Sequence, residues 1–157
     1  MNGDGGTTAG TATATPVENL YTATVAVSGG RAGTARSLTG SLEVSLTRPA
    51  QRGPEAAGTD PEELFAAGYA ACFDSALAVA ARQERIRTLG ATTVTASVTL
   101  GATEDHRYAI AVLLEVSSPD SPQADLERAV AAADRLCPYS NAVRGNTPVT
   151  IRVDGLR

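Results

Sequence analysis

The stretch EELFAAGYAACFDSALAVAARQE, residues 62–84, predicts a long helix at the centre of the fold. Gly68 is its only helix breaker; ahead of it Asp60 can act as the N-cap, and Pro61 suits the first helical position. Glu63 falls where the carboxylate of a capping box belongs. We expect one broad apolar face at helical spacing, formed by Leu64, Phe65, Tyr69, Cys72, Phe73, Ala76, Leu77 and Ala80. Small residues cover the rest of the helix and would let other backbones approach closely, so the helix should be largely buried.

The segments before this helix read as strands. YTATVAV (21–27) and GSLEVSL (40–46) alternate between apolar and polar residues, and the turn SGGRAG (28–33) follows the first of them. We expect an antiparallel meander, with one face of the second strand formed by Leu42, Val44 and Leu46. Residues 47–59 contain two prolines and two glycines and predict a loop.

The segments after the helix predict two strands, a second helix and a closing strand. The strands are TTVTASVTL (92–100), YAIAVLLEV (108–116) and TPVTIRV (147–153). The second helix should span about residues 122–136 and end before Pro138. Its inner stripe is expected to be Leu126, Val130, Ala133 and Leu136. Strands arranged around two helices in this order indicate an α+β fold and not a βαβ repeat.

Length and composition favour one globular domain. The chain has 157 residues, of which 43% are apolar and 19% charged. We expect a domain over residues 20–157 behind a flexible tail over residues 1–19, which lacks the pattern of a secretory signal. The net charge is −4 without a basic block, which argues against nucleic acid as a partner. No apolar run reaches the length of a membrane span, so no membrane partner is expected. A cytoplasmic, reducing location follows as the default, where a stable structural disulfide is unusual.

Two features of the composition exclude whole classes of mechanism. The chain contains no lysine, which rules out a P-loop lysine, a Schiff base and a lysine general base, so its thirteen arginines must supply the positive charge. Its one histidine, His106, lies in the polar stretch TEDHRY and is expected to be a solvated loop or strand-end residue. The two cysteines and this histidine match no zinc spacing, so we expect no metal and no other cofactor.

The two cysteines, Cys72 and Cys137, differ in their expected surroundings. Cys72 lies mid-helix, where burial raises the pKa of a thiol and no helix N-terminus opposes this effect. A reactive Cys72 would need an arginine, and Arg31 in SGGRAG is the candidate, although the residues alone favour an exposed hairpin charge. Cys137 ends a helix just before Pro138, a site suited to a thiol that attacks an oxidised partner. The residues alone favour two packed structural thiols over a redox pair, and both readings stay open.

A family resemblance favours the redox pair over two structural thiols. DPEELFAAGYAACF (60–73) together with CPYSNAVRGN (137–146) resembles the organic hydroperoxide resistance (Ohr) branch of the OsmC superfamily, over about residues 20–157. The resemblance implies an α+β fold with antiparallel sheets around two main helices, in an intertwined homodimer. It also implies thiol-dependent reduction of organic hydroperoxides, alkyl or fatty-acid, by a dithiol such as a lipoylated protein. A non-enzymatic redox sensor and an OsmC-like binding protein are the alternatives.

By the same resemblance, Cys72 matches the peroxidatic cysteine and Cys137 the resolving cysteine. Arg31 matches the arginine that stabilises the thiolate and polarises the peroxide, and Glu62 the carboxylate that orients it. The aromatic residues expected to line an apolar substrate site, or to be ordinary core residues, are Phe65, Tyr69 and Phe73. The residues expected to shape the turn after Cys137 are Asn141, Arg144 and Asn146.

Two features depart from the family pattern, and the separation of Glu62 from Cys72 along the helix bears on how the site is assembled. Asp134 stands where relatives tend to have histidine, and GATEDHRYAI (101–110) is more polar than expected; either could change substrate entry or reductant docking. Glu62 and Cys72 are ten residues apart, which on one helix separates their backbones by about 15 Å. We therefore expect Arg31 and Glu62 to serve the Cys72 of the partner subunit.

Overall fold

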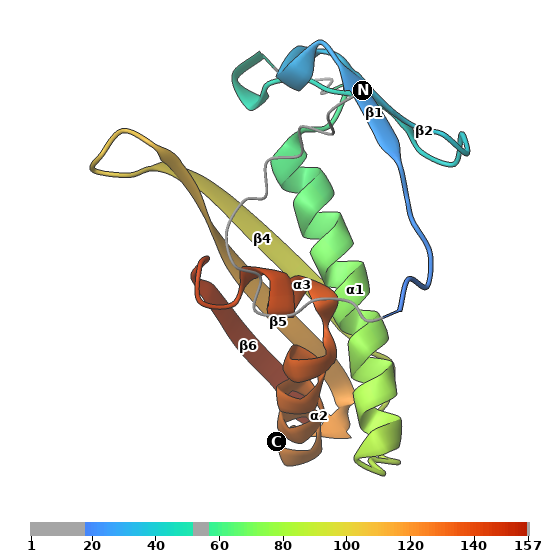
Figure 1. Ribbon diagram of the computed structural model, residues 1–157. Coiled ribbons are helices and arrows are strands. Elements are labelled where there is room, and N and C mark those ends of the chain that lie inside the picture. Colours follow the sequence, from blue (N-terminus) through green and yellow to red (C-terminus); the bar gives the residue numbers. More distant parts are fainter. Residues whose placement is uncertain (1–17, 52–56, 157) are drawn as a thin grey trace.

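The computed structural model describes residues 18–51 and 57–156, which form two three-stranded sheets and three α-helices (Figure 1). This confirms the α+β fold. The predicted tail, apart from its last two residues, lies outside the described residues. In chain order the elements are β1 Val25–Ser28, η1 Gly30–Ala32, β2 Thr34–Ser37, β3 Glu43–Ser45, η2 Pro49–Gln51, α1 Pro61–Gln83, β4 Thr93–Ala102, β5 Tyr108–Pro122, α2 Gln123–Leu136, α3 Pro138–Val143 and β6 Val149–Leu156.

Helix α1 begins where the sequence predicts. The Asp60 carboxylate accepts a hydrogen bond from the Glu63 backbone N–H at 2.8 Å, and Pro61 occupies the first turn. The hydroxyl of Thr59 donates to the Glu63 carboxylate at 2.7 Å, which ties the preceding residue to the same turn. This start fixes the direction in which α1 leaves the loop.

The main core lies between α1, α2 and the sheet formed by β4, β5 and β6 (Figure 1). Alternate residues of β5 point inward, and Val112, Leu114 and Val116 are buried. They pack in one cluster with Phe73 and Leu77 of α1 and with residues of α2. Because α1 supplies so much of this core, its composition is unusually apolar.

By length and composition alone, α1 could cross a membrane, which corrects the expectation that no segment is long and apolar enough. Its apolar residues have another explanation, since α1 packs on β4 and α2 as the core helix. Only 33% of its most apolar window is buried within the chain, however. Part of this apolar helix is thus not covered by the described residues of the single chain.

One strand pairing in the larger sheet differs from the expected one. β4 and β5 pair antiparallel, as do the strands of the smaller sheet, but β5 and β6 run parallel. Parallel neighbours need a crossover connection, and α2 with α3 supplies it on the face that α1 also covers. The expectation of purely antiparallel sheets is therefore wrong for this pair.

The smaller sheet, β1–β2–β3, confirms the N-terminal meander but contains a strand, β2, that the sequence analysis missed. In Figure 1 this sheet stands at the N-terminal end of α1, apart from the larger sheet. The turn before β2 depends on glycine: Gly29 has a φ of 77°, and a Cβ on Gly33 would lie 1.7 Å from the Ser28 carbonyl oxygen. Arg31 lies within this tight turn.

Helix α2 ends at Leu136, as predicted. Leu136 itself is 39% exposed, so the inner stripe of α2 stops at Ala133, contrary to expectation. Pro138 does end α2, but it also occupies the first position of α3, a helix that the sequence analysis did not predict. Cys137 is consequently the joint between two helices.

Candidate active site

The structure brings the two cysteines together. The Cys137 Sγ donates a hydrogen bond to the Cys72 Sγ over 3.5 Å, and both are free thiols. Cys72 projects from the middle of α1 and is half-buried, whereas Cys137 is 0% exposed. Cys72 is therefore the more accessible residue of the pair.

The Cys72 thiol is poorly acidic within a single chain. Burial raises its pKa, and the neighbouring Cys137 thiol raises it further. A hydrogen bond from the Tyr139 backbone N–H opposes these effects, because that donor favours the thiolate. None of these three influences is a cation, so a positive charge from elsewhere would be needed to make the thiolate abundant at neutral pH.

Arg31 and Glu62 form a bidentate ion pair. The guanidinium donates from Nη1 to Glu62 Oε2 at 2.7 Å and from Nη2 to Oε1 at 2.5 Å, with the side chains 40% and 16% exposed. This shared hydrogen bonding lowers the pKa of the Glu62 carboxyl and raises the pKa of Arg31. Arg31 is thus a cation held by one carboxylate, and at 40% exposure it is also the exposed turn charge that the residues alone favoured.

The ion pair and the thiol pair occupy different places in one chain. Glu62 lies in the first turn of α1 and Cys72 lies ten residues further along the same unbroken helix. At about 1.5 Å per residue their backbones are about 15 Å apart. The ion pair faces a cavity of about 370 Å³, lined by Arg31, Pro49, Asp60, Glu62, Glu63, Ala66, Ala96, Val98 and Leu100. The ion pair and the thiol pair are therefore two separate clusters within one chain.

Two of the three predicted aromatic residues contact a third ring, from Tyr139, that the sequence analysis did not single out. The centroids of Phe65 and Tyr69 lie 5.7 and 5.6 Å from that of Tyr139. Gly68 makes room for this cluster, since a Cβ there would lie 2.7 Å from the Tyr139 Oη. Phe73 is fully buried in the core and is removed from the candidate lining. The position of Tyr139, two residues after Cys137, was the signal available in the sequence.

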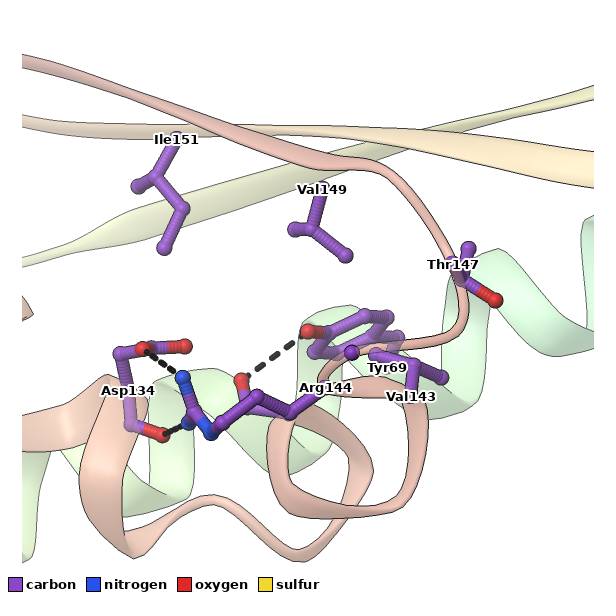
Figure 2. Close-up of a pocket in the computed structure, with 9 residues that line it drawn as sticks. Tyr69, Asp134, Val143, Arg144, Thr147, Val149 and Ile151 are labelled. Carbon is purple, nitrogen blue, oxygen red and sulfur yellow. Dashed lines mark hydrogen bonds and ion pairs between the residues drawn. The ribbon is translucent and has the colours of Figure 1, made fainter.

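A cavity of about 230 Å³ lies between β6 and residues of α1, α2 and α3 (Figure 2). The Tyr69 hydroxyl and the Ser140 hydroxyl hydrogen bond at 2.9 Å on one side of it. On the other side Arg144 extends to Asp134, with Nη1 donating to Oδ2 at 2.9 Å. Asp134, noted as a departure from the family pattern, is thus an ion-pair partner of Arg144.

The remaining polar candidates lie outside these sites. His106 is exposed in the turn between β4 and β5, with a left-handed φ of 61°, which matches the solvated loop residue that was expected. Among residues 18–51 and 57–156, no three His, Cys, Asp or Glu side chains are grouped as a metal site requires.

A half-buried cysteine lies against a buried one on an α+β scaffold that also carries an arginine held by a carboxylate, an arrangement that two-cysteine redox sites share. The chain belongs to the OsmC-like protein family, whose model matches residues 53–152. Within that family its named relatives are of the organic hydroperoxide resistance type, as the motifs indicated.

Three similar proteins illustrate the relationship. The organic hydroperoxide resistance protein of Xanthomonas axonopodis pv. citri (strain 306) is 40% identical over 88% of this chain and 97% of its own. OhrA of Bacillus subtilis (strain 168) is 45% identical, covering 85% of this chain and 96% of its own. The crystal structure of OhrB of Bacillus subtilis superposes with a TM-score of 0.80 at 38% identity, covering 86% of this chain and 99% of that one.

Proposed function

We propose that this protein acts in organic hydroperoxide resistance as a thiol-dependent peroxidase, a peroxiredoxin-like organic hydroperoxide reductase. The names of its relatives support the broader role. The observation that carries the finer proposal is the 3.5 Å contact between a half-buried sulfur, Cys72, and a fully buried one, Cys137. Two structural thiols would gain nothing from this difference in access, whereas a peroxidatic and a resolving thiol require it.

In the first step the Cys72 thiolate attacks one oxygen of the hydroperoxide. The S–O bond forms as the O–O bond breaks, leaving Cys72 as a sulfenic acid and releasing an alkoxide that takes up a proton to become the alcohol. The Tyr139 N–H stabilises the thiolate, and Arg31, oriented by Glu62, supplies the cation that is missing from the surroundings of Cys72 among the described residues.

In the second step the Cys137 thiol attacks the Cys72 sulfur. The disulfide forms and the sulfenic oxygen leaves as water, after which an external dithiol reduces the bond and is itself oxidised to a disulfide. A lipoyl group on a protein is the proposed reductant. No cofactor takes part in these steps, because the two cysteines carry all the electrons exchanged.

We propose that the working unit is a homodimer in which Arg31 and Glu62 of one subunit meet the Cys72 of the other. The separation of about 15 Å along α1 supports this arrangement. A stripe of small residues on α1 is also exposed in the single chain, formed by Ala67, Ala71, Ser75, Ala78 and Val79. The smaller sheet stands apart from the core of its own chain (Figure 1). Both features suit an intertwined partner.

The apolar surroundings favour alkyl or fatty-acid hydroperoxides over hydrogen peroxide. The rings of Phe65 and Tyr69 pack against that of Tyr139, whose backbone N–H contacts the Cys72 sulfur. Phe65 also lines a cavity of about 510 Å³ at the β4–β5 hairpin, together with Leu100, Tyr108, Ile110, Val143 and Pro148 among others. The polar segment 101–110 forms one rim of this cavity, so its effect on substrate entry is part of the proposal. A cytoplasmic location remains a prediction from the sequence.

A coupled peroxidase assay tests the function. Cumene hydroperoxide, a lipid hydroperoxide and hydrogen peroxide are compared, each with a lipoyl system and a thioredoxin system as reductant. We expect many turnovers per site with the organic hydroperoxides and the lipoyl system. Consumption of only one equivalent of peroxide would favour a redox sensor, and consumption of none a binding protein.

A further inference from the structure

Cys137 forms the joint between α2 and a very short helix, α3. α3 spans only Pro138–Val143, too short to be stable through its own backbone hydrogen bonds. Side-chain hydrogen bonds to both neighbouring helices hold it in place. The buried Tyr69–Ser140 hydrogen bond ties α3 to α1, and Arg144, at the C-terminal end of α3, ties it back to α2. The position of Cys137 therefore depends on these links.

Arg144 closes the joint with three hydrogen bonds. Its Nη1 donates to the Asp134 carboxylate at 2.9 Å, and its Nη2 donates to the Asp134 backbone oxygen at 2.8 Å and to the Asn141 Oδ1 at 3.3 Å. The Asn141 amide in turn donates to the backbone oxygen of Arg135 at 3.2 Å. The last carbonyl groups of α2, which have no partner within that helix, are thus capped from α3.

The hydrogen bonds of Arg144 to Asp134 and Asn141 enclose the residues that contact Cys72. Cys137 and Tyr139 both lie between Asp134 and Arg144, and they supply the neighbouring thiol and the backbone N–H donor. Cys137 is 0% exposed, so its sulfur reaches Cys72 only while the joint stays closed. Arg144 itself touches neither sulfur in any recorded contact; its effect is exerted through the backbone of α3.

Building on the proposed function, we propose that Arg144 and Asp134 are positioning residues that hold the buried Cys137 thiol against Cys72, and so set the balance between disulfide formation and over-oxidation. The sulfenic acid of Cys72 has two fates. Attack by Cys137 gives the disulfide and water. Attack of the sulfenate on a second hydroperoxide gives the sulfinic acid and an alcohol. A loosened joint slows the first reaction without slowing the second.

The experiment measures this balance directly. Reduced protein is exposed to increasing cumene hydroperoxide without reductant, and mass spectrometry gives the peroxide concentration at which half of Cys72 becomes sulfinic acid. That concentration compares the two fates of the sulfenic acid and is independent of how fast the thiol was first oxidised. For Arg144→Ala we expect it to fall roughly tenfold, because a displacement of about 1 Å is enough to slow a positioned reaction severely.

Matched variants separate position from stability. Arg128→Ala removes an exposed ion pair with Asp125 on the same helix, α2, and should leave the balance unchanged. Arg144→Lys, which keeps one charged donor, should recover part of the loss. Arg144 and Asp134 are 51% and 27% exposed, so their pair adds little to the free energy of unfolding and Arg144→Ala should still fold. If Arg144→Ala does not fold, Asp134→Ala, which keeps the bond to the Asp134 backbone oxygen, should shift the balance less but in the same direction.

Two different results would overturn two different claims. A folded Arg144→Ala, or in its place Asp134→Ala, with the half-oxidation concentration of the unmodified protein would overturn the positioning role. Failure of the unmodified protein to form the Cys72–Cys137 disulfide would overturn the proposed function itself.

Discussion

The buried sulfur of Cys137 lies 3.5 Å from the half-buried sulfur of Cys72, although 65 residues separate them in the chain. A disulfide bond is about 2.05 Å long, so oxidation requires the two sulfurs to approach by about 1.5 Å. The reduced form is thus close to the geometry of the disulfide.

Cys137→Ser should leave the first oxidation of Cys72 intact and stop the formation of the intramolecular disulfide. A serine hydroxyl is too weak a nucleophile near neutral pH to attack the sulfenic acid. After one exposure to cumene hydroperoxide, mass spectrometry should find Cys72 as sulfenic or more highly oxidised acid. Cys72→Ser is the control and should consume no peroxide. Normal cycling of Cys137→Ser with a lipoyl reductant would contradict the resolving role.

The reductant should attack the Cys72 sulfur of the disulfide and not the Cys137 sulfur. Thiol–disulfide exchange requires access for the attacking thiolate, and Cys137 is fully buried while Cys72 is not. Acid quenching of the oxidised protein shortly after addition of a monothiol should trap a mixed disulfide, which peptide mapping locates. We expect it on Cys72 in at least nine of ten trapped molecules, in line with the difference in access. A mixed disulfide mainly on Cys137 would show that the joint opens before reduction.

Much of the scaffold could be predicted from local sequence. The cap at Asp60 and Pro61 and the helical spacing of apolar residues located α1, because those signals act within a few residues of one another. The missed elements lack such signals: β2 is a four-residue strand after a glycine-rich turn, and α3 begins at a proline that also ends α2. The parallel pairing of β5 and β6 depends on how the chain crosses over, which no local pattern encodes.

The candidate site was less predictable, because its contacts join distant segments. The Arg31–Glu62 pair spans 31 residues and the contact between the thiols spans 65. The residues alone favoured an exposed hairpin charge at Arg31 and two packed structural thiols at the cysteines. Only the family resemblance predicted that these residues form the contacts seen here. The contacts of the Tyr139 ring with Phe65 and Tyr69 on α1 were missed for the same reason, since they depend on the position of α3.

Arg31→Ala should raise the apparent pKa of Cys72 by about 1–2 units, the equivalent of losing one charge-assisted contact of about 1.5–3 kcal/mol. Removing a cation disfavours the thiolate, so alkylation by iodoacetamide should need a higher pH to reach half its maximal rate. No lysine stands by to replace the lost charge. An unchanged titration would exclude Arg31 from the site.

Glu62→Gln provides the matched comparison for the pH dependence. The pKa of the Glu62 carboxyl is lowered by its hydrogen bonds from Arg31, so the ion pair persists above the ordinary carboxyl pKa and is lost only as the pH falls through the lowered value. The acid limb of the alkylation profile of the unmodified protein should therefore report the Cys72 thiol. Glu62→Gln should move Arg31 out of position and shift that limb in the same direction as Arg31→Ala, by a smaller amount.

Subunit complementation tests whether Arg31 and Glu62 serve the Cys72 of the partner. Chains carrying Cys72→Ser and chains carrying Arg31→Ala are mixed in equal amounts and exchanged by mild denaturation. In a two-fold dimer with a shared site, half of the dimers are mixed, and each mixed dimer regains one site with an intact cysteine and an intact arginine. About a quarter of the unmodified activity should then return, beyond the sum of the two parents.

The reverse mixture makes the test two-sided. Unmodified chains are exchanged with chains carrying both substitutions, Cys72→Ser and Arg31→Ala. If Arg31 acts across the interface, a mixed dimer contains no complete site, and only the unmodified dimers work, leaving about a quarter of the activity. If Arg31 acts within its own chain, every unmodified chain keeps a complete site and about half of the activity remains. The separation of about 15 Å between Glu62 and Cys72 on one unbroken helix favours the first result, because neither side chain can cross that distance.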